Sequence, residues 1–339
     1  MLVPILLFAA GLVLLIKGGD WFVDGSVGVA RRFHLPEILI GATVVSIGTT
    51  LPEVMVSATS ALEGQSEISY GNAIGSIICN TALVAAVTVA VRPDKIDRRS
   101  LKLPVIFFFL SAIFYSGIAY LFGTFSRPVG IALLAVFLVY TVLSVRQAKQ
   151  SPIAESTIGQ APADQAVPVE QVLRDDRKKA RLSLLKDIAF LIVGAGLIAV
   201  GARLLVNNGT KIAEAMGVPS TVIALTFVAL GTSLPELITA ITSLIKGHGA
   251  LSLGNVIGAN LFNLVLVSGM AITLRPFRVP ASSTIGGMNV SLTVDIPLML
   301  GVMLILTLPA LIRGKLARWQ GILLLCLYTA FCVFQFAIG

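Results

Sequence analysis

Gly48-Thr49-Thr50-Leu51-Pro52-Glu53 occurs in this chain with a near copy 183 positions later, Gly231-Thr232-Ser233-Leu234-Pro235-Glu236. Each copy places one carboxylate inside an apolar run, where a charged side chain is unfavourable by at least ~2.5 kcal/mol and is usually functional. Each copy also has proline directly before the glutamate. Because proline lacks an amide hydrogen and crowds the carbonyl four residues back, we expect a kink that exposes the carbonyls of Gly48 and Gly231. Such oxygens suit a hard cation.

The composition is that of a membrane protein with many spans. Of the 339 residues, 56% are hydrophobic and 12% charged, whereas soluble domains carry roughly 25% charged residues. Apolar runs near the ~20 residues that a spanning helix needs recur along the chain. Cys79, Cys326 and Cys332 all lie in apolar runs, so neither a disulfide framework nor a zinc site is expected.

Hydropathy predicts an all-α integral membrane protein with ten transmembrane helices in two five-helix halves, residues 1–145 and 184–339, joined by a cytoplasmic linker at 146–183. The expected helices cover residues 2–30, 36–62, 67–91, 104–124, 128–145, 184–213, 219–245, 250–274, 291–312 and 318–337.

The basic residues predict the orientation of these helices. The loops after odd-numbered helices hold 19 Lys and Arg residues, and the loops after even-numbered helices hold four. Because basic loops stay in the cytoplasm, we expect the linker inside and both termini outside, in a multi-pass protein of the cytoplasmic (inner) membrane. The net charge of +8 reflects this bias, so nucleic acid is not an expected partner.

The two motifs belong to a longer internal repeat. Without gaps, Pro36–Pro93 and Pro219–Pro276 agree at 22 of 58 positions. Since each half has an odd number of helices, the second half enters the membrane from the opposite side. An inverted-topology repeat is typical of secondary transporters, whose site lies near the midplane where the halves meet.

Polar residues form one stripe on the second and seventh expected helices, at steps of three and four. Interhelical hydrogen bonding could explain the hydroxyls, but not two symmetry-related glutamates. The stripe consists of Thr43, Ser46, Thr50, Glu53, Ser57 and Ser60 in the first copy. The second copy keeps Thr226, Ser233, Glu236 and Ser243 but has Ala229 and Ala240 where the first has serines.

The third and eighth expected helices carry a matching stripe beside small-residue pairs. Gly71 with Gly75, and Gly254 with Gly258, should let these helices approach the motif helices closely. The stripe comprises Ser69, Asn72, Ser76 and Asn80, and in the second half Ser252, Asn255, Ala259 and Asn263. Asparagine oxygens can bind a cation or hydrogen-bond a glutamate.

Two carboxylates in a low-dielectric site repel each other unless a cation or protons neutralise them. One Ca²⁺ does so fully and accepts six to eight oxygen ligands, whereas Mg²⁺ dehydrates reluctantly. Soft transition metals favour thiolate or imidazole ligands, so we expect calcium as cargo. No cofactor is expected.

GTTLPE and GTSLPE, followed by GNAIGSIICN and GNVIGANLFN, resemble the two α-repeats of the calcium/cation antiporter superfamily, and within it the sodium/calcium exchanger family. The resemblance implies alternating access, with the first and sixth helices sliding against a bundle that holds the site. It assigns calcium to Glu53 and Glu236 with the carbonyls of Thr49 and Thr232. It assigns sodium to Thr50, Ser233, Ser76 and the carbonyls of Ser46 and Ala229, with Asn80 and Asn263 at the centre.

The chain departs from the family pattern at three positions. Ala259 replaces a usual serine, Asn263 stands where some members have aspartate, and Ile77 replaces a common asparagine. Calcium binding should survive all three. Sodium as the coupling ion is less secure, so a Ca²⁺ (or general cation)/H⁺ antiporter on the same fold is the alternative.

Other classes fit less well. A channel needs no inverted repeat and would pass ions without a counter-ion, and nothing resembles a nucleophile with its base, so an enzyme is not expected. The partners are therefore Ca²⁺, Na⁺ and the lipid bilayer, and the sequence is compatible with a monomer. On the first helix, Asp20 lies three residues from Lys17, and we expect these two to form a local ion pair.

Overall fold

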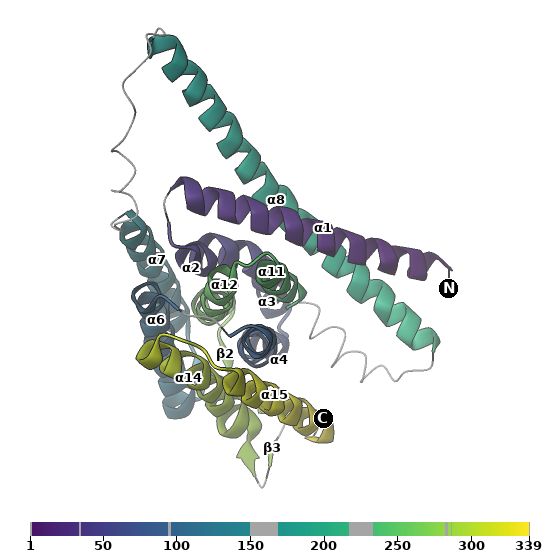
Figure 1. Ribbon diagram of the computed structural model, residues 1–339. Coiled ribbons are helices and arrows are strands. Elements are labelled where there is room, and N and C mark those ends of the chain that lie inside the picture. The colour runs from purple at the N-terminus through teal and green to yellow at the C-terminus, as the bar shows by residue number, and fades with distance from the viewer. Residues whose placement is uncertain are drawn as a thin grey trace.

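The computed structural model describes residues 2–33, 35–93, 96–149, 169–216, 233–281, 284–285 and 287–338. Helices dominate this part of the chain, and Figure 1 shows them as a bundle beside two long crossing helices, α1 and α8. In chain order the helices are α1 (Leu2–Arg32), α2 (Glu37–Ile40), α3 (Ser46–Leu62), α4 (Ser66–Cys79), α5 (Ala86–Val91), α6 (Arg98–Phe122), α7 (Arg127–Lys149), α8 (Val169–Ala215), α11 (Leu234–Ile245), α12 (Gly249–Phe262), α13 (Ser268–Leu274), α14 (Ile296–Arg313) and α15 (Arg318–Ile338).

Four π-helical turns and four two-residue strands complete the described part. The π-turns are η1 (Gly41–Val45), η2 (Asn80–Ala85), η5 (Asn263–Val267) and η6 (Ser291–Asp295). The strands form two antiparallel pairs, β1 (Thr124–Phe125) with β2 (Phe277–Arg278) and β3 (Thr284–Ile285) with β4 (Met288–Asn289). Three of the π-turns join helices end to end: η1 connects α2 to α3, η2 connects α4 to α5, and η5 connects α12 to α13, whereas η6 leads from β4 into α14.

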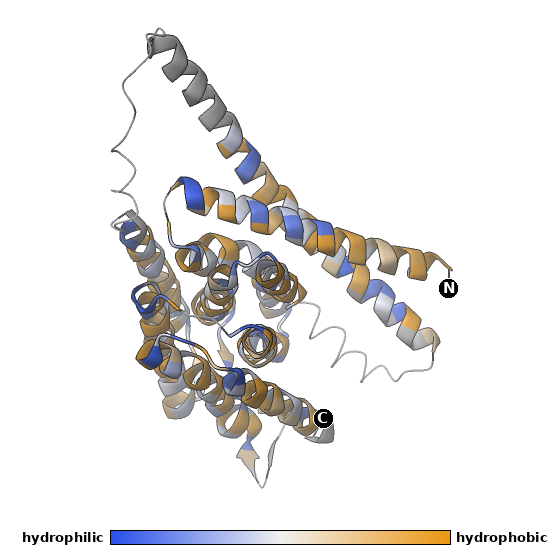
Figure 2. Cartoon of the chain, viewed as in Figure 1, coloured by the Kyte–Doolittle hydropathy of each residue, from blue (hydrophilic) through white to orange (hydrophobic). Residues whose placement is uncertain are grey.

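Eight helical segments in the described residues are long and apolar enough to cross a membrane. Figure 2 shows hydrophobic residues along their lengths. Aliphatic and aromatic side chains cover the outside of this bundle because lipid tails, unlike water, are as apolar as leucine. The chain is an all-α integral membrane protein, as its hydropathy predicts.

The observed helices differ from the predicted ones mainly at α8. The sequence predicts a helix over 184–213, but α8 begins at Val169, within the predicted linker. The mixed charges of 170–179 include opposite signs four positions apart in the sequence, a spacing that favours helix formation. The predicted helix over 219–245 is described only as α11, because 217–232 lie outside the described residues.

Helix α3 continues through Pro52 without interruption. The change in hydrogen bonding lies earlier, at η1, where the amide of Ser46 donates to the carbonyl of Gly41 five residues back. Since proline carries no amide hydrogen, the carbonyl of Gly48 still lacks its helical donor. The carbonyl of Gly48 can therefore lack its helical hydrogen bond although α3 itself is not interrupted at Pro52.

Local structure repeats between the two halves at the same offset of 183 residues. Gly64 and Gly247 both adopt positive φ, +85° and +83°. The amide of Gln65 donates to the carbonyl of Ser60 at 2.8 Å, and that of His248 to the carbonyl of Ser243 at 2.7 Å. The π-turns η2 and η5 also begin at equivalent residues, both asparagines. The sequence repeat is thus matched by repeated backbone geometry.

Close glycine contacts bring α12 against the start of the second predicted span. A Cβ placed on Gly254 would lie 2.2 Å from the carbonyl oxygen of Ile38, and one on Gly258 would lie 2.6 Å from Cα of Ala42. These two glycines therefore permit the approach predicted for them. The residues equivalent to Ile38 and Ala42 in the second half lie outside the described residues, so the prediction for Gly71 and Gly75 stays untested.

Burial separates the inner helices from the outer ones. In the segment 249–274, 83% of the most apolar window is buried, against 22% in α1 and 22% in α8. Helices α1 and α8 pack along each other at one edge, as Figure 1 shows. Helix α12 therefore lies at the centre, in contact with η1, α3 and α11, which carry or adjoin the two motifs.

Candidate functional site

Glu53 and Glu236 are the buried charged side chains of the described residues, and both are fully buried. Glu53 lies on α3 and Glu236 in the first turn of α11. The two carboxylates are close enough for their charges to repel each other. Among the described residues, none of their four oxygens has a hydrogen-bond partner. The structure thus brings the two motif glutamates together, and no ion pair with a basic side chain neutralises either of them in the described part of the chain.

The hydroxyl of Thr49 lies at the contact between the halves. It donates to the side-chain oxygen of Asn255 at 3.2 Å and lies beside the carboxylate of Glu236. One turn earlier, the hydroxyl of Ser46 lies 2.6 Å from the carbonyl of Gly41 and 2.9 Å from that of Asn255. These contacts join the first motif to α12 of the second half.

Unpartnered hydroxyls and amides lie on or beside the helices that carry the two carboxylates and on the π-turns that contact these helices. Each lies in a residue at most 2% exposed, and each lacks a partner among the described residues. Because a buried polar group without a partner is unfavourable by about 1–3 kcal/mol, such a cluster calls for a ligand or water. The predicted site residues in this set are Thr50, Ser233, Asn80 and Asn263.

Both central asparagines begin a π-turn, Asn80 in η2 and Asn263 in η5. A π-turn re-aims the side chains that follow it and is frequent at functional sites. Helix α3 packs against η5 and α11 packs against η2, so each glutamate helix contacts the π-turn of the opposite half. Ser76, the remaining predicted hydroxyl, is buried on α4.

Asn72 fixes the backbone of the first motif. Its side-chain amide donates to the carbonyl of Glu53 at 3.1 Å and to the hydroxyl of Ser57 at 2.8 Å. In the second half, Ala240 stands at the position of Ser57, and the amide nitrogen of Asn255 has no partner among the described residues. The two halves of the site are therefore chemically unequal.

Two predicted ligands, Thr232 and Ala229, lie outside the described residues. The structure adds one group that the repeat did not indicate. The hydroxyl of Thr239 is fully buried and unpartnered, three residues beyond Glu236. Its equivalent in the first half is Val56, so comparison of the two repeats does not indicate Thr239. Its position three residues after Glu236, on the same face of the helix, would have indicated it.

The donor set is that of a hard cation. No three His, Cys, Asp or Glu side chains gather into a metal cluster in the described ranges. A cation bound beside Glu53 and Glu236 would therefore have two carboxylates to balance its charge and neutral oxygens as its other ligands. Hydroxyl, amide and carbonyl oxygens complete the coordination of Ca²⁺ or Na⁺, and they are poor ligands for soft metals.

Comparison with known proteins identifies the family. The family model described as sodium/calcium exchanger protein matches residues 3–146 and 186–337. The chain belongs to the sodium/calcium exchanger family. Sodium/calcium exchanger MaX1 of Methanosarcina acetivorans is 29% identical over 360 residues, covering 99% of each chain. Membrane protein MJ0091 of Methanocaldococcus jannaschii is 34% identical over 321 residues, covering 95% of this chain and 94% of that one.

A solved structure of the sodium-calcium exchanger NCX_Mj has the same fold. It superposes with a TM-score of 0.78 at 32% sequence identity and covers 98% of each chain. That crystal was soaked with Na⁺ and Sr²⁺. The exchanger described here is thus a multi-pass membrane transporter of a family that exchanges calcium and sodium, which confirms the resemblance in its motifs.

Proposed function

We propose that this exchanger moves Ca²⁺ across the cytoplasmic membrane in exchange for Na⁺ by alternating access. The observation that carries the proposal is the pair of fully buried glutamates, one from each motif, with no hydrogen-bond partner among the described residues. One Ca²⁺ neutralises both carboxylates, and sodium ions can do the same in its place. Calcium and sodium therefore compete for the same two carboxylates, and this competition is the basis of antiport.

The proposed ligands follow the predicted set. Glu53 and Glu236 bind calcium with the carbonyls of Thr49 and Thr232. Sodium is bound by a wider group of hydroxyls, carbonyls and central amides, which comprises Thr50, Ser233, Ser76, the carbonyls of Ser46 and Ala229, Asn80 and Asn263. Burial of the described side chains supports this assignment. The lack of hydrogen-bond partners in the described part of the chain supports it for Glu53, Glu236, Thr50, Ser233, Asn80 and Asn263.

The proposed topology has ten membrane helices in inverted halves, residues 1–145 and 184–339, with the linker 146–183 in the cytoplasm and both termini outside. Repeated turn geometry at an offset of 183 residues supports the repeat. The basic residues support the orientation. In this scheme α1 and α8, packed on each other at the edge, slide against the bundle that holds the two motifs.

Proton coupling is the second candidate, because Ala259 and Asn263 remove a hydroxyl and a carboxylate that other members have. Two protons neutralise Glu53 and Glu236 as one Ca²⁺ does. Calcium/proton exchange at that ratio moves no net charge, whereas exchange for more than two sodium ions is electrogenic. Current carried by reconstituted protein therefore separates the two candidates.

Glu53→Gln and Glu236→Gln test the site. Each substitution leaves one buried carboxylate, which cannot neutralise Ca²⁺, so we expect loss of ⁴⁵Ca²⁺ binding and of uptake at unchanged expression. Glu63→Gln is the matched control, because Glu63 follows the same helix but is exposed. Substantial calcium transport by both site variants would refute the assignment.

A further inference from the structure

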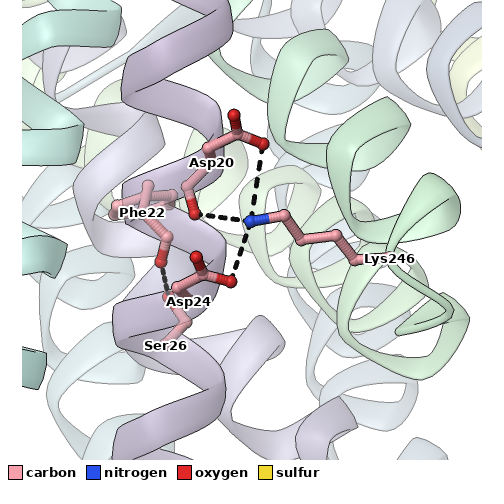
Figure 3. A network of polar contacts seen from close by, with 5 residues as sticks. All are labelled: Asp20, Phe22, Asp24, Ser26 and Lys246. Carbon is pink, nitrogen blue, oxygen red and sulfur yellow. Dashed lines mark hydrogen bonds and ion pairs between the residues drawn. The ribbon is translucent and has the colours of Figure 1, made fainter.

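Lys246 holds α1 against α11 through a charged contact at the end of α11. Its ammonium lies 2.8 Å from a carboxylate oxygen of Asp24, 3.4 Å from one of Asp20, and 2.9 Å from the backbone carbonyl of Asp20. Figure 3 shows the lysine side chain reaching across to α1, with the nitrogen between the two aspartates. Asp20 therefore pairs with Lys246, and the local pair with Lys17 predicted from the sequence is wrong.

The contact of Lys246 with Asp20 and Asp24 joins the α1–α8 pair to α11. Within the α1–α8 pair, backbones meet at glycines: a Cβ on Gly18 would lie 2.8 Å from the amide nitrogen of Ile198. The pair also has its own ion pair, Arg32 with Asp187 at 3.9 Å. Lys246, by contrast, belongs to α11, which carries the second motif. It is therefore placed to fix the edge pair relative to the site.

Phe22 lies between the two aspartates in sequence and points to another side of α1, as Figure 3 shows. Its ring is fully buried, and a Cβ on Gly48 would lie 3.2 Å from the ring edge. Together with Thr49, Pro52 and Pro235 it lines a narrow gap between α1, α8 and the two motifs. The ring thus closes over the first residue of the first motif.

We propose that Lys246 is a positioning residue: by binding Asp20 and Asp24 it holds α1 in the position in which Phe22 covers Gly48. This position of α1 against α11 is called the seat, and exchange requires α1 to leave it, so that the seat opens. The inference rests on the proposed function for its role in transport, but the seat itself does not. Both ion pairs are part-exposed, and such pairs stabilise by at most about 1 kcal/mol each. A contact of that strength can hold one state and still release it in every cycle.

Disulfide formation measures the seat directly. A Cβ on Gly19 of α1 would lie 3.7 Å from Cβ of Thr242 on α11, within the spacing that a disulfide needs. The pair Gly19→Cys and Thr242→Cys is introduced after the native cysteines, Cys79, Cys326 and Cys332, are replaced by alanine. The oxidation rate in proteoliposomes then reports how often α1 is seated.

Lys246→Met should lower the rate of disulfide formation by about five- to thirtyfold, the factors that correspond to the upper strength of one and of both ion pairs that it removes. Lys246→Arg should retain the rate because it keeps the charge, and Lys246→Glu combined with Asp20→Lys and Asp24→Lys should restore it. Lys17→Met is the matched control, because it removes a lysine of α1 close to Asp20 in the sequence, and it should leave the rate of disulfide formation unchanged. Equal rates in Lys246→Met, Lys17→Met and the parent would overturn the proposal.

Transport measured in parallel separates this inference from the proposed function. With the disulfide formed, ⁴⁵Ca²⁺ uptake should stop and return on reduction, and Lys246→Met should change the turnover rate at saturating calcium more than the concentration for half-maximal uptake. A protein that exchanges no calcium but shows the charge-dependent disulfide rates would refute the function and keep the seat. Full uptake by the cross-linked protein would refute the requirement that the seat opens.

Discussion

Gly258→Ala places one methyl group at the contact between α12 and the helix of the first motif. The new Cβ would lie 2.3 Å from the hydroxyl oxygen of Ser46 and 2.6 Å from Cα of Ala42. Both distances are far below van der Waals contact. The serine hydroxyl cannot turn away freely, because it lies 2.6 Å and 2.9 Å from the carbonyls of Gly41 and Asn255. The backbone at Ala42 must therefore move.

The expected loss of stability follows from these contacts. Overpacking a close-packed site is unfavourable by about 1–3 kcal/mol, and a broken hydrogen bond of Ser46 adds about 1 kcal/mol. The better helix propensity of alanine returns at most about 1 kcal/mol. The net loss is about 1–3 kcal/mol, which corresponds to a fall in Tm of about 3–10 °C at about 3 °C per kcal/mol. Because Ser46 adjoins the site, calcium uptake should fall with it.

The assay is thermal unfolding of the purified protein in detergent, with uptake measured on the same preparation. Gly117→Ala is the control, since no described atom lies within 4 Å of its added Cβ. It should raise Tm slightly through helix propensity alone. A Gly258→Ala protein as stable as the Gly117→Ala protein would refute the close contact of α12 with η1 and the start of α3.

Two further predictions concern coupling and the cap at the N-terminus of α6. Ala259→Ser should lower the sodium concentration needed for half-maximal calcium exchange if the missing hydroxyl is a lost ligand, and an unchanged sodium response in flux assays would contradict this. Asp97 caps α6: although burial opposes it, hydrogen bonds from Ser100 and the amide of Arg99 hold the pKa of its carboxyl below the usual range. The cap therefore stabilises the folded protein at pH values above the ordinary pKa of aspartate, and this contribution is lost as the pH falls through the lowered pKa. Asp97→Ala should lower the stability by about 1 kcal/mol at neutral pH and change it little in acid. Tm measured against pH tests this.

Periodicity and repetition predicted much of the fold. The positions of Glu53 and Glu236 followed from one repeated motif, and the stripe at steps of three and four predicted that Thr50 and Ser57 share their side of α3. These signals are strong because a membrane leaves few reasons to bury a carboxylate. The close approach of Gly254 and Gly258 followed from residue size in the same way.

The features that the sequence did not predict depend on contacts between distant segments. The π-turns at Asn80 and Asn263 have no periodic signature, because the most apolar windows of the segments that contain them are 72% and 83% buried. A helix buried on nearly all sides is apolar all round, so it has no stripe whose phase an extra residue could shift. The partner of Asp20 was predicted three residues away, but the tertiary fold supplies Lys246 from 226 positions away. Local spacing cannot compete with a contact that forms only when α1 packs on α11.

The central claim is that sodium drives calcium across the membrane through the site of Glu53 and Glu236. The direct test is ⁴⁵Ca²⁺ uptake into sodium-loaded proteoliposomes, with external sodium removed and the pH clamped on both sides. We predict rapid uptake that collapses when internal sodium is replaced by choline, and that is absent with Glu53→Gln. Uptake that ignores sodium and follows an imposed pH difference would contradict the claim and assign the two glutamates to proton exchange.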